Sequence, residues 1–329
     1  MLSRGSLKDM SLDSQYEYAT PRSSGSFGSS TSRVSTSSGG KLAATPLMIK
    51  QEGPRTEDSY VLDYLTSGAQ GSLFRAIVKA TNETIALKVV KFDSTLQRNF
   101  AIQEVENLIR ITKNGCHPFI VCYYNYFLYN DRMLIEMEFV NGKTLSEWSR
   151  DYRNQKYFNL LDDHLVNLTK DIAKALQYIH NLNTIHRDIK PDNIMITPEK
   201  IPKLLDFGLA CKTDTCYVGE PENIVPRNCC TGRSGTPVFM AREVIQEAVS
   251  YFASDMWSLG ATIVNASTGM YCYVFPPGGD MQAIFQTIIN QQPLILETPN
   301  RKLNDAVNSM LQVDLLKRPT AAEIVARLS

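Results

Sequence analysis

The chain contains no long apolar run, no excess of charge of one sign and no block of basic residues. Its 329 residues include 34 Lys and Arg and 34 Asp and Glu, so its formal net charge is zero. No stretch of about 18 apolar residues occurs, and the polar first ten residues do not resemble a signal segment. The myristoylation and prenylation patterns are absent as well. We therefore expect no membrane attachment and no nucleic-acid partner, because scattered basic residues do not form a continuous positive surface.

Regular cysteine spacing is also lacking. The seven cysteines are odd in number and irregularly placed, which predicts reduced thiols and a cytoplasmic or nuclear location. Four of them gather at Cys211, Cys216, Cys229 and Cys230. Their spacings fit the usual zinc patterns poorly, although thiolates could still converge in space. We favour small, partly buried thiols in a mobile loop over a metal site.

Residues 1–55 have few apolar side chains and include SSGSFGSSTSRVSTSSGG, which is dense in Ser, Thr and Gly. Such a composition buries too little surface to offset the entropy of ordering, so we expect a disordered tail. Arg4, Arg22 and Arg33 each lie within three residues of a serine. The tail could therefore be phosphorylated or bind a regulatory partner, and a simple spacer explains its composition equally well. Residues 56–329 form the predicted folded domain.

From Tyr60 onward the sequence has the texture of a folded domain. Three short β-rich runs separated by turns, YVLDYL, SLFRAIV and TIALKVVKF, predict antiparallel strands. A helix is expected at about Thr95 to Thr112, and two further strands, VCYYNYFLY and RMLIEMEFV, are joined at Asn130 and Asp131. Beyond Gly142 the pattern is mainly helical, so the sequence predicts an α+β protein with a small β-rich part and a larger helical part. One long helix carries an apolar stripe of Leu161, Leu165, Leu168, Ile172, Leu176 and Ile179.

The first turn, LTSGAQGSLF at Leu65 to Phe74, contains two glycines that could let backbone N–H groups approach a phosphate. An ordinary β-turn would explain the same glycines. Lys88 follows in an apolar strand and would need an acidic partner to hold its extended side chain. We prefer Glu104, in the next helix, to Glu106, which lies about 200° around that helix. Two solvated glutamates are the alternative.

The densest group of chemically active side chains is TIHRDIKPDN at residues 184–193. Together with LLDFGLA and GTPVFMARE, which follow it in that order, it resembles the signature set of eukaryotic-type serine/threonine protein kinases. The resemblance covers about residues 58–328 and includes the glycine turn and the lysine strand. It implies a bilobal α+β kinase fold. A small β-rich N-lobe with one main helix would occupy about 58–140, and a larger helical C-lobe about 141–328.

The resemblance implies a site for ATP and Mg²⁺. Asp206 would bind one magnesium ion and Asn193 a second, since hard magnesium prefers oxygen ligands. Asp188 would orient the acceptor hydroxyl and take its proton as a catalytic base. Lys190, a residue typical of the serine/threonine class at this place, would neutralise the transferred phosphoryl group. Thr236 is expected to bond to Asp188 and Lys190 as part of the same site.

The remaining nucleotide contacts implied by the resemblance come from the glycine turn, the lysine strand and the segment between the lobes. Lys88, held by Glu104, would contact the inner phosphates. Met137 would line the pocket, and Glu138 to Val140 would offer backbone groups to adenine. The full set is Leu65, Thr66, Ser67, Gly68, Ala69, Gln70, Gly71, Leu73, Ala86, Lys88, Glu104, Met137, Glu138 and Val140.

Other matched positions imply structural roles. Asp255 would hold the backbone of the catalytic loop, and Arg318 would pair with Glu243. Three positions depart from the family pattern and leave open the docking of the substrate and the subfamily: Thr66, Phe239 and Arg242.

The segment between DFG and MARE is long, and we expect it to be mobile unless a phosphate or a partner orders it. Arg187 and Lys212 could meet a phosphate carried by this segment, with Thr231 and Ser234 as the candidate acceptors. The alternative is a segment that becomes ordered without modification.

The resemblance implies an ATP-dependent kinase that acts on Ser and Thr hydroxyls of protein substrates. Two alternatives stay open. A pseudokinase scaffold would bind partners through the same fold, and a small-molecule or lipid phosphotransferase would share the metal and base residues.

Overall fold

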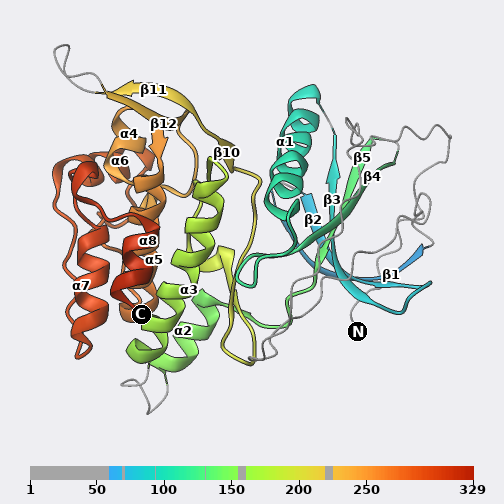
Figure 1. The fold of residues 1–329 in the computed structure, drawn as a ribbon, viewed down its shortest axis with the longest axis horizontal. Coiled ribbons are helices and arrows are strands. Elements are labelled where there is room, and N and C mark those ends of the chain that lie inside the picture. The colour runs from blue at the N-terminus through green and yellow to red at the C-terminus, as the bar shows by residue number, and fades with distance from the viewer. Residues whose placement is uncertain (1–58, 69–70, 93, 130, 155–160, 219–224) are drawn as a thin grey trace, which may run out of the picture. The chain divides into compact units, whose positions relative to one another are not determined.

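The computed structural model describes residues 59–68, 71–92, 94–129, 131–154, 161–218 and 225–329 (Figure 1). The chain divides into two compact units. Unit 1 consists of Met1–Thr95 and Tyr124–Met137, and unit 2 of Leu96–Tyr123 and Glu138–Ser329. The predicted disordered tail, residues 1–55, lies outside the described residues.

Unit 1 is built on a five-stranded sheet of order β1-β2-β3-β5-β4. Antiparallel pairing joins β1 to β2 and β2 to β3. The strands predicted from β-rich runs between turns are therefore confirmed. Their bounds are Tyr60–Gly68 (β1), Gly71–Val78 (β2), Thr84–Lys91 (β3), Tyr123–Tyr129 (β4) and Arg132–Glu138 (β5).

One face of this sheet carries the core of unit 1. Ile85, Leu87 and Val89 alternate along β3 and belong to one buried apolar cluster with Tyr60 and Leu134. Since successive side chains of a strand point to opposite faces, Lys88 lies on the other face of the sheet. Its side chain is half-buried there.

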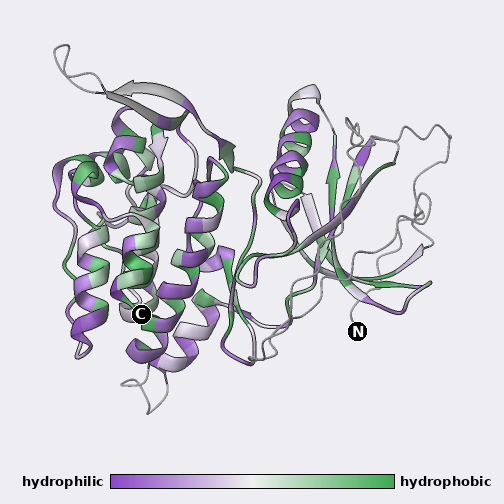
Figure 2. Cartoon of the chain, in the orientation of Figure 1, coloured by the Kyte–Doolittle hydropathy of each residue, from purple (hydrophilic) through white to green (hydrophobic). Residues whose placement is uncertain are grey.

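Helices dominate unit 2, and Figure 1 shows α2 to α8 gathered in it. The predicted stripe is confirmed, because all six of its side chains are buried on α3. Purple and green bands alternate along this helix in Figure 2, as expected of a helix with one apolar face. No helix within the described ranges combines the length and apolarity needed to cross a bilayer. The bounds are Thr95–Thr112 (α1), Leu145–Arg153 (α2), Leu161–Asn181 (α3), Arg242–Gln246 (α4), Phe252–Thr268 (α5), Met281–Asn290 (α6), Arg301–Met310 (α7) and Ala321–Arg327 (α8).

The helix α1 has the predicted bounds, yet its contacts group it with unit 2 rather than with the sheet. Asn107 donates from Nδ2 to the carbonyl oxygen of Ala210 at 2.7 Å. The hydroxyl of Tyr178, on α3, donates to the carbonyl oxygen of Ile111 at 2.7 Å. These hydrogen bonds tie the helix to the segment after DFG and to α3.

Short strands form three small sheets in unit 2, and they pair β10 with β7, β11 with β12 and β13, and β6 with β8 and β9. In the segment between DFG and MARE, Asp214–Val218 and Val225–Thr231 form an antiparallel hairpin that also pairs with β13. These backbone ladders pair the described part of the segment with β13, and its mobility in the absence of a phosphate or a partner stays a prediction. The bounds are Lys143–Thr144 (β6), Thr184–Ile185 (β7), Ile194–Ile196 (β8), Pro202–Leu204 (β9), Cys211–Lys212 (β10), Asp214–Val218 (β11), Val225–Thr231 (β12) and Val249–Tyr251 (β13).

The prediction of reduced cysteines is wrong in this structure. Disulfides join Cys116 to Cys122 and Cys211 to Cys230, and Cys229 is also disulfide-bonded. Pairing requires Cα atoms about 4.4 to 6.8 Å apart, a condition that the fold sets and sequence spacing does not. Among the described residues no group of three or more His, Cys, Asp and Glu is placed to hold a metal ion.

Candidate active site

A buried aspartate holds the backbone of the loop that follows β7 and carries Asp188, here called the catalytic loop. Asp255 lies in the first turn of α5, where the helix dipole stabilises a carboxylate. Its Oδ2 accepts from the backbone N–H of His186 and its Oδ1 from that of Arg187, both at 2.9 Å. The predicted role of Asp255 is confirmed, and the loop after β7 is fixed by two charge-assisted hydrogen bonds.

One side chain of this arrangement was missed in the sequence. His180, in the last turn of α3, has its Nε2 2.9 Å from Asp255 Oδ2 and stacks on the ring of Phe252. A histidine in the last turn of a long apolar helix gives little sign of its partner in the sequence. The one hint in the sequence was that His180 lies only six residues before His186, whose backbone N–H binds the same aspartate.

Both oxygens of the Asp188 carboxylate are engaged by neighbouring side chains. Thr236 Oγ1 donates to Asp188 Oδ1 at 2.7 Å. Lys190 Nζ lies 2.9 Å from Asp188 Oδ2 and donates to Thr236 Oγ1 at 2.9 Å. Asn193 Nδ2 donates to Asp188 Oδ2 at 2.9 Å. The predicted contacts of Thr236 are confirmed, and a cation and two polar donors surround one buried carboxylate.

The β8–β9 hairpin brings Asn193 and Asp206 to the same end of one small sheet. Asn193 precedes β8 and Asp206 follows β9, and these strands are antiparallel. The backbone N–H of Leu205 donates to the carbonyl oxygen of Asn193 at 2.9 Å, which extends the ladder toward Asp206. Because Asn193 uses its amide nitrogen toward Asp188, its oxygen is turned to the other side. One amide oxygen and one carboxylate suit Mg²⁺, which takes few protein oxygens and completes its shell with waters and phosphates.

Backbone conformation sets Arg187 and Asp206 apart from their surroundings. Both have a positive φ, 69° and 55° respectively, in the left-handed region that disfavours side chains with a Cβ. Such conformations persist where the surrounding structure fixes them, and they concentrate at functional sites. At Asp206 the fixing contacts include the fully buried ring of Phe207, which packs edge-to-face on His186.

In unit 1, the predicted nucleotide-binding residues form a row across the sheet. Thr66 on β1 is opposite Leu73 on β2, and Leu73 is opposite Lys88 on β3. Residues directly opposite each other in an antiparallel sheet share a face, so the three side chains point to one side. Ala86, two residues before Lys88, shares that face. Leu65 and Ser67 are exposed on β1. Ala69 and Gln70 lie outside the described residues.

The two glycines of the first turn differ in what the fold requires of them. Gly71 has a φ of +121°, and a Cβ there would lie 2.5 Å from the carbonyl oxygen of Val89. The ordinary structural explanation is therefore sufficient for Gly71. A Cβ at Gly68 would meet no described atom within 4 Å, so packing does not explain that glycine.

At the predicted adenine-binding segment, Met137 is half-buried and Val140 is buried. The backbone N–H of Glu138 donates to the carbonyl oxygen of Cys122 at 2.7 Å, and its carboxylate lies 2.8 Å from Lys203 Nζ. Of the Glu138 backbone, only the carbonyl oxygen thus stays a candidate for adenine. In α1, Glu104 is buried and Glu106 exposed, in keeping with the choice of Glu104 as the partner of Lys88. Lys88 and Glu104 belong to different units, and their pairing stays a prediction.

A family model of the protein kinase domain matches residues 60–328. The chain belongs to the protein kinase family. Its sheet-based N-terminal region and helical C-terminal part are those of the predicted α+β kinase fold. Members of this family generally use ATP and Mg²⁺ and act on protein substrates.

Two departures of this kinase from the family pattern have structural explanations. Arg242, at the place of a proline, donates from Nε to the carbonyl oxygen of Ile288 and from Nη2 to that of Gln291, at 3.1 and 2.6 Å. These are orphan carbonyls at the C-terminal end of α6, where a cation also complements the helix dipole. Phe239 is buried and packs edge-to-face on Tyr271.

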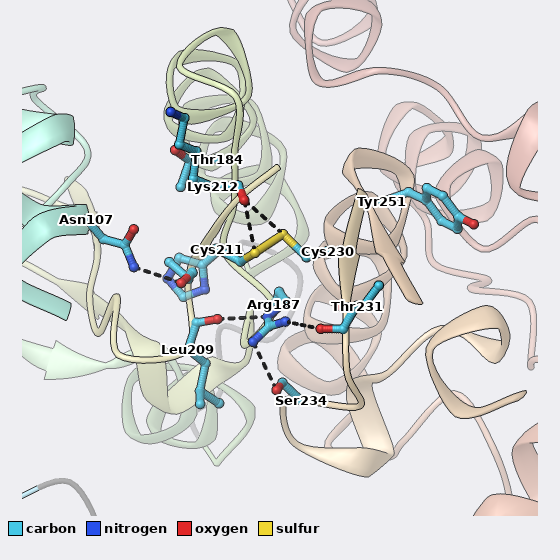
Figure 3. Close-up of a disulfide and its surroundings, with 12 residues drawn as sticks. Asn107, Thr184, Arg187, Leu209, Cys211, Lys212, Cys230, Thr231, Ser234 and Tyr251 are labelled. Carbon is cyan, nitrogen blue, oxygen red and sulfur yellow. Dashed lines mark hydrogen bonds between the residues drawn. A yellow bond between two sulfur atoms is a disulfide. The ribbon is translucent and has the colours of Figure 1, made fainter. Parts of the chain in front are cut away.

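The guanidinium of Arg187 bridges the two ends of the segment that joins DFG to MARE (Figure 3). It donates from Nε to the carbonyl oxygen of Leu209 at 2.8 Å, from Nη1 to that of Thr231 at 3.2 Å and from Nη2 to Ser234 Oγ at 3.0 Å. Burial lowers the pKa of Arg187, while the charge of Asp255 raises it. An anion placed here would compensate the desolvated cation.

Proposed function

We propose that this kinase is catalytically active and transfers the γ-phosphoryl group of ATP to serine or threonine hydroxyls of protein substrates. The observation that carries the proposal is the triangle of Asp188, Lys190 and Thr236. In it, an aliphatic hydroxyl donates to the Asp188 carboxylate at 2.7 Å beside an ammonium group. A substrate serine or threonine presents the same hydroxyl chemistry to the same base.

The residues of unit 2 divide the reaction among them. Asp188 orients the acceptor hydroxyl through a carboxylate oxygen and takes its proton as the new P–O bond forms. Lys190 neutralises negative charge that shifts onto the transferred group, since phosphoryl transfer depends more on electrostatics and alignment than on covalent help. Asn193 and Thr236 hold the Asp188 carboxylate in place.

Asp206 and Asn193 are the residues that would hold Mg²⁺. A bound ion would neutralise phosphate charge and align the phosphates for in-line transfer. The left-handed backbone at Asp206 and the hairpin ladder at Asn193 fix the two oxygen donors before any ion binds. This preorganisation reduces the reorganisation that binding would otherwise require.

Unit 1 would bind the nucleotide. Lys88 would contact the inner phosphates, with Thr66 and Leu73 in the same row of the sheet. Gly68 supports this assignment, because a Cβ there would meet no described atom within 4 Å, which leaves room for a phosphate to approach the backbone. Met137 and Val140, with the Glu138 carbonyl, would frame the adenine.

We further propose that the protein acts in the cytoplasm or nucleus and that its N-terminal tail, residues 1–55, can take a regulatory partner. We expect no membrane and no nucleic acid among its partners. The proposed compartment is one where disulfides are usually transient.

A radiolabelled transfer assay tests the proposal. The purified chain, ATP with Mg²⁺ and a generic protein acceptor should give label on serine and threonine, as read by phosphoamino-acid analysis. The Asp206→Ala variant, purified in parallel, should remove that label and so exclude a contaminating kinase. Nucleotide binding without transfer would instead favour the pseudokinase scaffold. Label on small molecules or lipids, with none on protein, would favour the third class of enzyme.

Phosphate on the segment between DFG and MARE is expected to raise the activity. Ser234 is the better placed acceptor, because its hydroxyl oxygen already meets Arg187 Nη2, whereas Thr231 meets Arg187 through its backbone carbonyl. Changing both Thr231 and Ser234 to Ala should lower protein phosphorylation several-fold and leave the KM for ATP nearly unchanged, because the loss affects the substrate platform.

Mass spectrometry of cell-derived wild-type protein should find the phosphate on Thr231 or Ser234. Phosphatase treatment of that protein provides the matched control and should reproduce the loss of the double variant. Full activity in protein shown to carry no phosphate on this segment would contradict the prediction.

A further inference from the structure

The Cys211–Cys230 disulfide closes the segment that follows DFG. Cys211 lies on β10, a few residues after Asp206, and Cys230 lies near the end of β12, with a sequence separation of 19 residues. Figure 3 shows the bond between the two strands. The bond therefore brings the beginning of this long segment against its later part.

The two cysteines belong to different sheets. Cys211 pairs with Ile185 on β7, next to the catalytic loop. Cys230 pairs with Ser250 on β13, which leads into α5. The disulfide is thus a covalent joint between the sheet beside the catalytic loop and the sheet of the hairpin. A noncovalent contact near the same joint is the exposed hydrogen bond from Asn228 Nδ2 to Asn183 Oδ1 at 3.3 Å.

Arg187 spans the same joint. Its guanidinium binds Leu209, two residues before Cys211, and Thr231, the residue after Cys230. Further along the chain, Thr236 reaches the Asp188 carboxylate. A bond that holds β10 to β12 therefore also helps to position Leu209 and Thr231, which accept from Arg187, and Thr236, which binds Asp188.

The surroundings suit both the disulfide and the dithiol. The Cys211 residue is half-buried and Cys230 is buried, so Cys211 is the more accessible of the two cysteines. The carbonyl oxygen of Lys212 lies 3.2 Å from Cys211 Sγ and 3.7 Å from Cys230 Sγ. Once reduced, either thiol has an acceptor for its proton, which makes the reduced state accessible without an unsatisfied buried donor.

We propose that the Cys211–Cys230 disulfide is a reversible redox clamp of this segment, oxidised in the ordered, transfer-competent form and reduced in a loosened form. Closing a loop of this length removes disorder that the open segment would otherwise have. The disulfide would add a covalent link to the backbone ladders that pair β12 with β11 and β13. In a reducing compartment such disulfides are usually transient and redox-sensing. The regulatory part of this proposal depends on the proposed transfer activity, whereas the ordering does not.

The exchange step needs a dithiol as reductant. Its thiolate attacks Cys211 Sγ, the Cys211–Cys230 bond breaks, and the Cys230 sulfur leaves as a thiolate that takes a proton. The second thiol of the reductant then displaces Cys211 from the mixed disulfide. The products are two protein thiols and one cyclic disulfide of the reductant, with two electrons and two protons transferred to the protein.

Hydrogen exchange measured by mass spectrometry tests the clamp on the full chain after phosphatase treatment. Reduction with dithiothreitol should speed amide exchange in residues 209–213 and 228–234 by at least about tenfold, because the disulfide no longer limits local opening of these strands. Transfer to a protein acceptor should fall about fivefold under the same conditions, with little change in the KM for ATP. Unchanged exchange would overturn the proposal.

Thiol labelling under native conditions reports which bond has opened. Iodoacetamide should label Cys211 after reduction and spare Cys272, because burial raises the pKa of the Cys272 thiol to about 12. The Cys211→Ser/Cys230→Ser variant should exchange fast in both redox states. The Cys116→Ser/Cys122→Ser variant is the matched control and should keep the wild-type redox response.

A redox response that survives in the Cys211→Ser/Cys230→Ser variant would assign the effect to another disulfide and overturn the proposal. If that variant does not fold, reduction of the wild type with peptide mapping of the labelled thiols still decides the question. If reduction speeds hydrogen exchange in a chain that shows no transfer activity, the redox clamp is supported and the proposed kinase activity is contradicted. If the chain transfers phosphate but reduction leaves hydrogen exchange unchanged, the kinase activity is supported and the redox clamp is contradicted.

Discussion

Replacing Lys88 by methionine is expected to leave a folded protein whose phosphotransfer is lower by at least about a hundredfold. That loss corresponds to about 2.7 kcal/mol of transition-state stabilisation. Lys88 lies on the face of β3 opposite the core residues Ile85, Leu87 and Val89, so the substitution leaves the packing of this core intact. What disappears is the positive charge that we propose to contact the inner phosphates, while the apolar stem of the side chain keeps its volume.

Lys91→Met is the matched control, since it makes the same substitution on the same strand. Lys91 is exposed at the end of β3, and its variant should transfer phosphate at the wild-type rate. Both variants should melt near the wild-type temperature, measured by circular dichroism. Lys88→Met protein with wild-type kcat/KM would show that this lysine does not orient the nucleotide.

Much of the fold could be predicted because it depends on periodicity within short windows. The helix α1 and the six buried side chains of α3 follow from apolar residues at three- and four-residue steps, and the strands of unit 1 from β-rich runs between turns. The contacts of Thr236 and Asp255 followed from a resemblance in which the order of motifs along the chain fixes which side chains meet.

The features that could not be predicted depend on distances across the fold. The Cys211–Cys230 pair has no spacing rule, and only the placement of β10 and β12 makes a bond feasible. The β11–β12 hairpin was missed because its sequence, rich in polar residues and containing Pro226, resembles a loop until β13 supplies a third strand. The sequence showed Arg242 only as a departure from the family pattern, because its partners are carbonyl groups of a helix more than 40 residues away.

Breaking the ion pair between Glu243 and Arg318 is expected to lower the free energy of unfolding by about 3–5 kcal/mol. Arg318 Nη1 and Nη2 reach Glu243 Oε1 and Oε2 at 2.6 and 2.8 Å, and both side chains are buried. The guanidinium also donates to the carbonyl oxygens of Gln312, Ala253 and Val313. Arg318→Met leaves a carboxylate buried without its cation, and Glu243→Leu leaves a cation without its carboxylate, so each single change exposes the full desolvation cost of the other group.

The double variant Glu243→Leu/Arg318→Met separates the value of the pair from the cost of an orphaned charge. Because the double variant removes both charges together, its loss in free energy of unfolding should not exceed the larger of the two single losses. The difference between the sum of the single losses and the loss of the double variant measures the coupling between Glu243 and Arg318. Arg301→Leu, at a solvent-exposed pair with Asp305 whose atoms lie 3.7 Å apart, is the comparison that should show no measurable loss in urea unfolding. Single losses below about 1 kcal/mol, or strictly additive ones, would mean that the ion pair does not hold α4 to the segment between α7 and α8. The Arg318 guanidinium also lies over the ring of Trp257, 4.9 Å from its centroid, so Arg318→Met removes that cation–π contact together with the ion pair.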